Sequence, residues 1–205
     1  MSMVFRAGRL AVLTALVSMG VAFAAEAAEV RITGVPEGGD LYQTLSGGSL
    51  LVEQGQAETP PSTQETVAAA QADYGRLLAV LYDNGYFGPV IKITLDGTDA
   101  ANIPPVRPPR RIDRAVISVT PGPLFRFGGV QIAPLAPDTE LPERFAKGQV
   151  AGLGVLKEAV ASGIDGWRAQ GHAKAALADQ QLSARHPDKT ITANLRLAPG
   201  PKLRF

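Results

Sequence analysis

The stretch Pro121-Gly122-Pro123-Leu124-Phe125-Arg126-Phe127 decides the fold, because it returns at the end of the chain as Pro199-Gly200-Pro201-Lys202-Leu203-Arg204-Phe205. Two prolines flanking a glycine restrict φ on both sides and leave the middle residue free, which favours a sharp reversal. Each copy follows a stretch in which apolar and polar residues alternate. The repeat predicts a tandem pair of small domains, with Pro121, Gly122 and Pro123 as the interdomain hinge.

The first predicted unit covers residues 28–121. Its clearest element is a helix that begins at the capping-box sequence Ser62-Thr63-Gln64-Glu65 and ends at Asn84-Gly85. Alternation and helical spacing elsewhere predict the order strand, helix, helix, strand, strand. These five elements are expected at 30–33, 40–53, 62–84, 90–95 and 112–120.

The second predicted unit, residues 122–200, repeats this order with less margin. Its opening strand contains Gly128-Gly129, where a bulge is expected, and its long helix carries Gly163 and Gly166, which each cost about 1 kcal/mol relative to alanine. The five elements are expected at 125–132, 141–148, 155–170, 174–184 and 190–198. The fold class is therefore α+β: two tandem β-α-α-β-β units, each a three-stranded sheet covered by two helices.

Residues 1–27 have the layout of a secretory signal peptide. Arg6 and Arg9 precede an uncharged run over residues 10–25, which small residues follow, and cleavage is expected after Ala27 or Ala24. The alternative is an uncleaved inner-membrane anchor, but the run is short for a span, which needs about 20 residues. The sequence thus predicts export, to the periplasm if the host has two membranes.

The composition and charge exclude several classes of function. A formal net charge of +1 without a local basic cluster argues against a nucleic-acid binder, and the absence of cysteine excludes disulfides and thiolate sites. His172 and His186 are the only imidazoles, and neither lies in a metal-ligand or catalytic motif. We therefore expect no enzyme activity, no cofactor and no metal.

The proline-rich segment 103–111 has two possible interpretations. Residues 103–111 read Ile-Pro-Pro-Val-Arg-Pro-Pro-Arg-Arg. They are either a polyproline ligand with basic flanks or a stiff connection between two strands of the first unit, and the second interpretation is favoured.

The order of elements resembles a known family. The helix end Tyr82-Asp83-Asn84-Gly85-Tyr86-Phe87, and the junction from Val119 through Pro123 into Phe125-Arg126-Phe127-Gly128, look like tandem POTRA domains of the BamA/TamA superfamily of outer-membrane assembly factors, nearest to its TamA-like branch. The second unit departs from this pattern, since Gln170-Gly171-His172-Ala173 stands at the equivalent helix end.

The resemblance implies a function without chemistry. Such domains precede a third unit and a membrane barrel, so the chain looks like an amino-terminal fragment in which 201–205 begin a third unit. It would bind unfolded outer-membrane or autotransporter proteins by β-strand addition and dock to a TamB-like partner anchored in the inner membrane. The implied edge strand consists of Val90, Ile91, Lys92, Ile93, Thr94 and Leu95, with 174–182 as a less secure counterpart.

Two other functions stay open on the residues alone. One is a secreted enzyme with an irregular site, and the other is a periplasmic scaffold that binds a folded partner.

Overall fold

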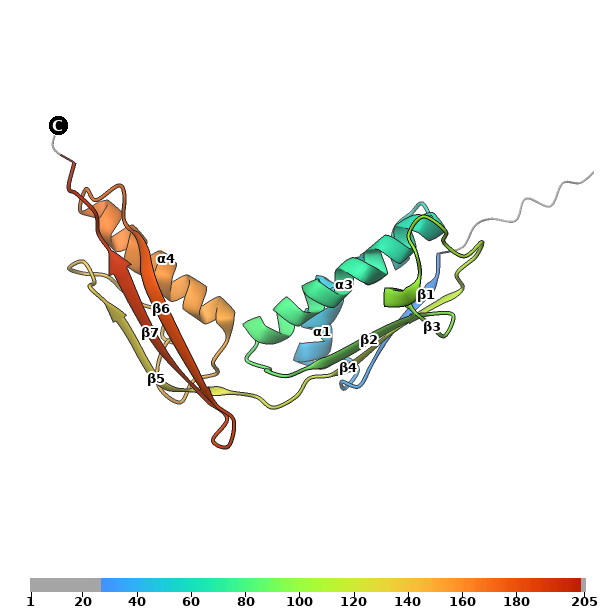
Figure 1. The fold of residues 1–205 in the computed structure, drawn as a ribbon, viewed down its shortest axis with the longest axis horizontal. Helices are drawn as coiled ribbons and strands as arrows, with labels where there is room; N and C mark the ends of the chain where they lie inside the picture. Colours follow the sequence, from blue (N-terminus) through green and yellow to red (C-terminus); the bar gives the residue numbers. More distant parts are fainter. Residues whose placement is uncertain (1–26, 204–205) are drawn as a thin grey trace, which may run out of the picture.

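The structure of the protein is a computed structural model, which describes residues 27–203 of the 205-residue chain. All but the last residue of the predicted signal peptide lie outside this part. The described chain forms two α+β units, each with helices packed on one face of a sheet (Figure 1), which confirms the predicted fold class.

The first unit contains a four-stranded sheet in the order β1-β4-β2-β3. Strand β1 pairs with β4 in parallel, and β2 pairs with β4 in antiparallel orientation. The very short β3, which forms a hairpin with β2, was not predicted. The elements are β1 (Glu29–Thr33), α1 (Asp40–Gly48), α2 (Leu50–Gly55), α3 (Thr63–Asp83), β2 (Val90–Leu95), β3 (Thr98–Asp99), η1 (Ala100–Asn102) and β4 (Arg114–Thr120).

The helix expected over 40–53 is two helices, so that prediction is corrected. The break falls at Ser49, whose backbone is extended. The buried Asp73 on α3 causes it: its carboxylate accepts hydrogen bonds from Ser49 Oγ (2.6 Å), Leu50 N–H (2.8 Å) and Leu51 N–H (3.1 Å). A carboxylate placed on free N–H groups favours a new helix start there.

Helix α3 forms as expected. Ser62 and Glu65 make both hydrogen bonds of the capping box. At the other end, Gly85 has φ +80°, and Tyr86 N–H donates back to Leu81 O (2.9 Å). A left-handed glycine of this kind ends the helix and turns the chain toward β2.

The second unit contains a three-stranded sheet in the order β5-β7-β6, with β5 parallel and β6 antiparallel to β7. The register of β5 shifts between Phe127 and Gly129, which confirms the predicted bulge. The elements are β5 (Arg126–Ala133), α4 (Leu153–Ala169), β6 (Ala176–Arg185) and β7 (Thr190–Ala198).

This second sheet is covered by one helix instead of two. The residues expected as a helical turn, 141–148, form separate turns, such as the one closed by Phe145 N–H to Pro142 O (2.8 Å). Gly148 N–H then donates to Phe127 O (2.7 Å), and Phe145 is buried against the core. One isolated helical turn recovers little of its nucleation cost, so pairing with the sheet prevails.

Each unit has its own apolar core. The first lies between α1, α2, α3 and the sheet β1-β4-β2, with Leu77, Leu81 and Ile117 fully buried. The second lies between α4 and the sheet β5-β7-β6, with Phe125 and Phe127 at its centre. The two clusters have no residue in common.

Candidate functional site

The outer strands of the two sheets are candidate binding sites for another chain. A strand at the edge of a sheet presents unpaired N–H and C=O groups that can pair with another chain. The structure decides which of these groups are open, because successive residues of a strand point their main-chain groups to opposite sides.

Strand β2, the predicted edge, turns three residues outward. Glu29 N–H donates to Asp113 O (2.9 Å), so the main-chain groups of Asp113 point toward β1. Along β4 the main-chain groups then point alternately to β1 and to β2, and this fixes which residues of β2 pair with β4. It follows that the main-chain groups of Ile91, Ile93 and Leu95 face away from β4.

Two of these three positions are covered from within the chain. Leu95 pairs with Thr98 of β3. Ile93 N–H donates to the hydroxyl of Tyr74 on α3 (3.2 Å), and that hydroxyl lies 2.9 Å from a carboxylate oxygen of Asp99. Within residues 27–203 no pairing is seen for the main chain of Ile91, so the predicted edge is open there alone.

Polar contacts hold in place the residues that cover β2, namely Tyr74 and the segment from Thr98 to Ile103, which we call the cover. Gln71 Nε2 donates to Ala100 O (2.9 Å) and Ile103 O (2.8 Å), which fastens the segment after β3 to α3. Hydrogen bonds from Ala101 N–H and the Tyr74 hydroxyl hold the pKa of Asp99 below its ordinary value. Burial raises the pKa of Tyr74, which keeps its hydroxyl protonated as a donor.

Strand β6, the equivalent strand of the second unit, is open over most of its length. It pairs with β7 on one side, and no strand of the described part pairs with its other side. The hydrogen bond from Arg126 N–H to Lys189 O (3.0 Å) shows which residues of β7 point their main-chain groups toward β5, and the residues between them point toward β6. The main-chain groups of Gln180, Leu182 and Ala184 therefore face outward.

An apolar groove runs beside this open edge. It lies between α4 and β6, has a volume of about 210 Å³, and is walled mainly by aliphatic side chains. Leu182 is 41% exposed, which is high for a leucine on the helix-covered side of a sheet. The lining residues are Leu153, Leu156, Lys157, Val160, Leu177, Gln180 and Leu182.

The other face of the same sheet is polar. Asn194 on β7 stands between Gln131 on β5 and Gln181 on β6 in the strand register, and all three amides are exposed. They line a shallow hollow of about 460 Å³ together with Asp179 and Arg196. A strand added at β6 would thus meet an apolar groove on one face and amides on the other.

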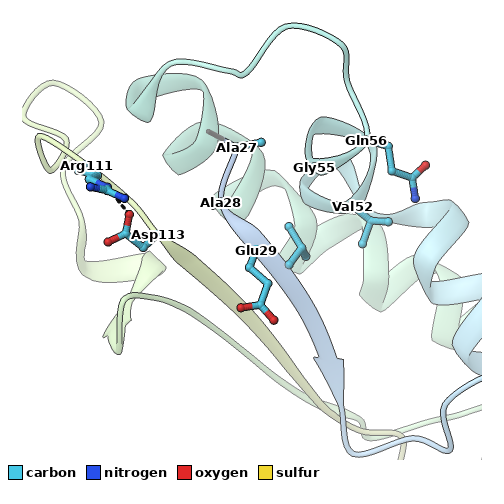
Figure 2. Close-up of a pocket in the computed structure, with 9 residues that line it drawn as sticks. Ala27, Ala28, Glu29, Val52, Gly55, Gln56, Arg111 and Asp113 are labelled. Atoms are coloured by element: carbon cyan, nitrogen blue, oxygen red, sulfur yellow. Dashed lines mark hydrogen bonds and ion pairs between the residues drawn. The ribbon is translucent and has the colours of Figure 1, made fainter. Parts of the chain in front are cut away.

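Figure 2 shows a further hollow of about 460 Å³ at the start of β1. Val52, Gly55 and Gln56 lie on one side of it, and Arg111 and Asp113 lie on the other. Arg111 is paired with Asp113, and arginines likewise neutralise the nearby Glu29. The charged groups on its rim are therefore already paired.

The two histidines lie at opposite ends of β6. His172 Nδ1 is 2.8 Å from Gly200 O and its ring packs edge-on against Trp167, whereas His186 packs against Phe125. Among residues 27–203, no cluster of histidine and carboxylate groups is suited to hold a metal ion.

The predicted hinge residues connect β4 to β5. Gly122 has φ +77°, and a Cβ there would lie 3.0 Å from the carbonyl oxygens of both Phe87 and Gly88. The predicted polyproline segment is an exposed loop anchored by buried Ile103 and Ile112. No helix within 27–203 has the length and apolar character that a membrane crossing requires.

The fold is similar to solved structures, although no protein-family model and no curated protein matches the chain. POTRA domains 3–5 of BamA from Haemophilus influenzae align over 87% of this chain and 67% of their own, with 12% identity and a TM-score of 0.50. POTRA domains 1–2 of the periplasmic domain of Omp85 from Anabaena align over 86% of this chain and 95% of their own, with 17% identity and a TM-score of 0.41. The likeness to BamA shows that the fold is that of POTRA domains.

Proposed function

We propose that the chain is the periplasmic part of an outer-membrane protein assembly factor, and that it binds unfolded barrel proteins by β-strand addition at β6. The observation that carries this proposal is the open edge of β6 beside the groove under α4. Strand addition is a known mode of peptide recognition, in which main-chain hydrogen bonds give affinity and pockets for alternate side chains give selectivity.

The two faces beside β6 favour one kind of client. Transmembrane barrel strands alternate apolar and polar residues. A strand paired with Gln180, Leu182 and Ala184 would direct alternate side chains into the aliphatic groove and the others toward the amide row of Gln181 and Asn194. Because main-chain pairing does not read side-chain identity, one edge can serve many clients of this pattern.

The finer assignment rests on the sequence resemblance. As part of a TamA-like factor for autotransporters, the chain would be exported by its signal peptide and would continue into a barrel beyond residue 205. It would dock to a TamB-like partner in the inner membrane. In this proposal Val90–Leu95 contributes less than β6 to client binding. Leu95 and Ile93 are covered by Thr98 and Tyr74, which leaves Ile91 to pair.

A proline substitution in β6 tests the proposal. Leu182→Pro removes the outward N–H and leaves the hydrogen bonds from Gln181 and Ser183 to β7 in place, as edge strands tolerate. We expect it to abolish binding of a ten-residue barrel-strand peptide, measured by fluorescence anisotropy. Ser183→Thr is the matched control, since it changes a neighbouring side chain that lines neither the groove nor the amide row and keeps every main-chain donor.

The readout separates binding from folding. Amide exchange along β7 should be the same in Leu182→Pro as in the native chain. If that strand stays protected and the peptide still binds, β6 is not the client edge.

A further inference from the structure

The two units are joined by more than the Pro-Gly-Pro connection. Residues just after α3 pair with the residues leading into β5: Phe125 N–H donates to Gly85 O (2.9 Å), and Phe87 N–H donates to Pro123 O (3.3 Å). The first unit therefore extends its antiparallel pairing across the connection into the second.

The same stretch is also held by the second unit. Ala151 N–H donates to Phe125 O (3.0 Å), and Val150 forms an isolated bridge with Arg126. The chain entering β5 is thus fixed from both units at Phe125, two residues after the predicted hinge. A change of angle at the hinge would break pairing on at least one of its sides.

Two glycines allow the units to approach closely, one against a main-chain carbonyl and one against a side chain. A Cβ on Gly152 would lie 2.1 Å from Asp83 O, and a Cβ on Gly85 would lie 2.5 Å from Val150 Cγ1. Gly152 has φ −76°, a value open to any residue, so its need for glycine is steric alone. The end of α3 and the start of α4 therefore touch without room for a side chain.

Aromatic rings continue the contact. Tyr82 stacks on Phe87 with ring centres 5.2 Å apart, and Phe87 packs edge-on against Phe125 at 5.3 Å. Phe125, which is fully buried, packs in turn against His186 in the turn between β6 and β7 at 5.4 Å. This row of rings runs from α3 of the first unit to the turn between β6 and β7 of the second.

We infer that the two units move as one rigid body. The contacts made by Gly85, Phe87, Phe125 and Gly152, which we call the joint, fix the bend, that is, the angle between the two units. This angle then does not vary at Pro121, Gly122 and Pro123. Opening the bend would expose Phe125 and break the hydrogen bonds on either side of it. If the proposed function holds, a client on β6 is therefore held at one set angle to the first unit and to whatever docks there.

A distance measurement tests the joint directly. The chain has no cysteine, so Ala72→Cys on α3 and Ala161→Cys on α4, both exposed, give a specific spin-labelled pair across the joint. Double electron–electron resonance should show a single narrow distance distribution in the otherwise native chain. A broad or multiple distribution in that sample would overturn the inference, whatever the peptide-binding result.

Substitution at the joint gives the second arm. Gly152→Ala should replace the narrow distribution with a broad or shifted one. Gly154→Ala is the matched control, since its Cβ would lie 3.7 Å from the nearest atoms of Asp83, an ordinary contact. An unchanged distribution in folded Gly152→Ala would also contradict the inference.

A milder variant guards against unfolding. Phe87→Ala removes one ring from the row without altering either sheet, and it should broaden the distribution less than Gly152→Ala does. Amide exchange within β4 and β7 should stay native in both variants, which separates loss of the joint from loss of either fold.

Discussion

The hydroxyl oxygen of Tyr74 lies 3.2 Å from both the main-chain nitrogen and the carbonyl oxygen of Ile93. A side chain from the covering helix thus takes the place that a partner strand would occupy on β2. No such side chain reaches the outward groups of β6 in the described part of the chain. The two strands lie at equivalent places in the fold but therefore differ in how many of their main-chain groups are left without a partner.

Removing the Tyr74 hydroxyl should uncover Ile93. In Tyr74→Phe the Ile93 amide loses its acceptor and Asp99 loses a donor. Hydrogen exchange at Ile93 should become faster, and the free energy of unfolding should fall by about 1 to 3 kcal/mol, the usual net worth of two hydrogen bonds. Exchange by NMR and urea unfolding measure the two effects. Tyr42→Phe is the control, and equal Ile93 exchange in both variants would show that the hydroxyl does not cover the edge.

Acid should loosen the same cover. The pKa of Asp99 is lowered by the hydrogen bonds from Ala101 N–H and the Tyr74 hydroxyl. A folded pKa below the unfolded one means that ionised Asp99 stabilises the cover above about pH 4, and that this contribution is lost as the pH falls through the folded pKa. The Ala101 amide shift should titrate below about pH 4. In Asp99→Asn this titration should vanish, and a titration that persists would assign it to another group.

Asp73 should be among the most sensitive positions of the first unit. Asp73→Ala leaves the Ser49 hydroxyl and the N–H groups of Leu50 and Leu51 without their acceptor in a buried site, at about 1 to 3 kcal/mol for each unsatisfied group. Urea unfolding should show a total loss of at least about 3 kcal/mol. Asp73→Asn keeps one acceptor oxygen and should lose less, and exposed Glu53→Ala should lose almost nothing.

The order of elements could be read from the sequence because it rests on local signals. The capping box at Ser62 and Glu65, the bulge at Gly128-Gly129 and the alternation along β7 all act within a few residues. The break at Ser49 could not be read, because the carboxylate that causes it belongs to Asp73 on another helix.

The candidate site shows the same limit. Alternation along Val90–Leu95 correctly indicates a strand, but it contains no sign that Tyr74 and Thr98 cover that strand. Likewise, Pro121-Gly122-Pro123 indicates a sharp turn, whereas the contact of Gly152 with Asp83 depends on how the two units pack. Whether an edge is open and how closely two units pack both depend on tertiary contacts, which local sequence patterns do not contain.

Two helix glycines should respond to alanine with opposite signs. Gly75 on α3 is exposed, and a Cβ there would meet nothing within 4 Å, so Gly75→Ala should stabilise the protein by about 0.5 to 1 kcal/mol through helix propensity. On α4, a Cβ at Gly166 would lie 2.2 Å from Thr139 Oγ1, and that hydroxyl is already fixed by a hydrogen bond to Ala136 O (2.8 Å).

Gly166→Ala must therefore push the loop that carries Thr139 away from α4. Overpacking of this kind costs about 1 to 3 kcal/mol, more than the helix gains, so the net effect should be a loss of stability. Urea midpoints of the two variants measure the contrast. Thr139→Ala should relieve the clash in the double variant, and a stabilised Gly166→Ala would mean that the loop yields without cost and that the glycine is not required for packing.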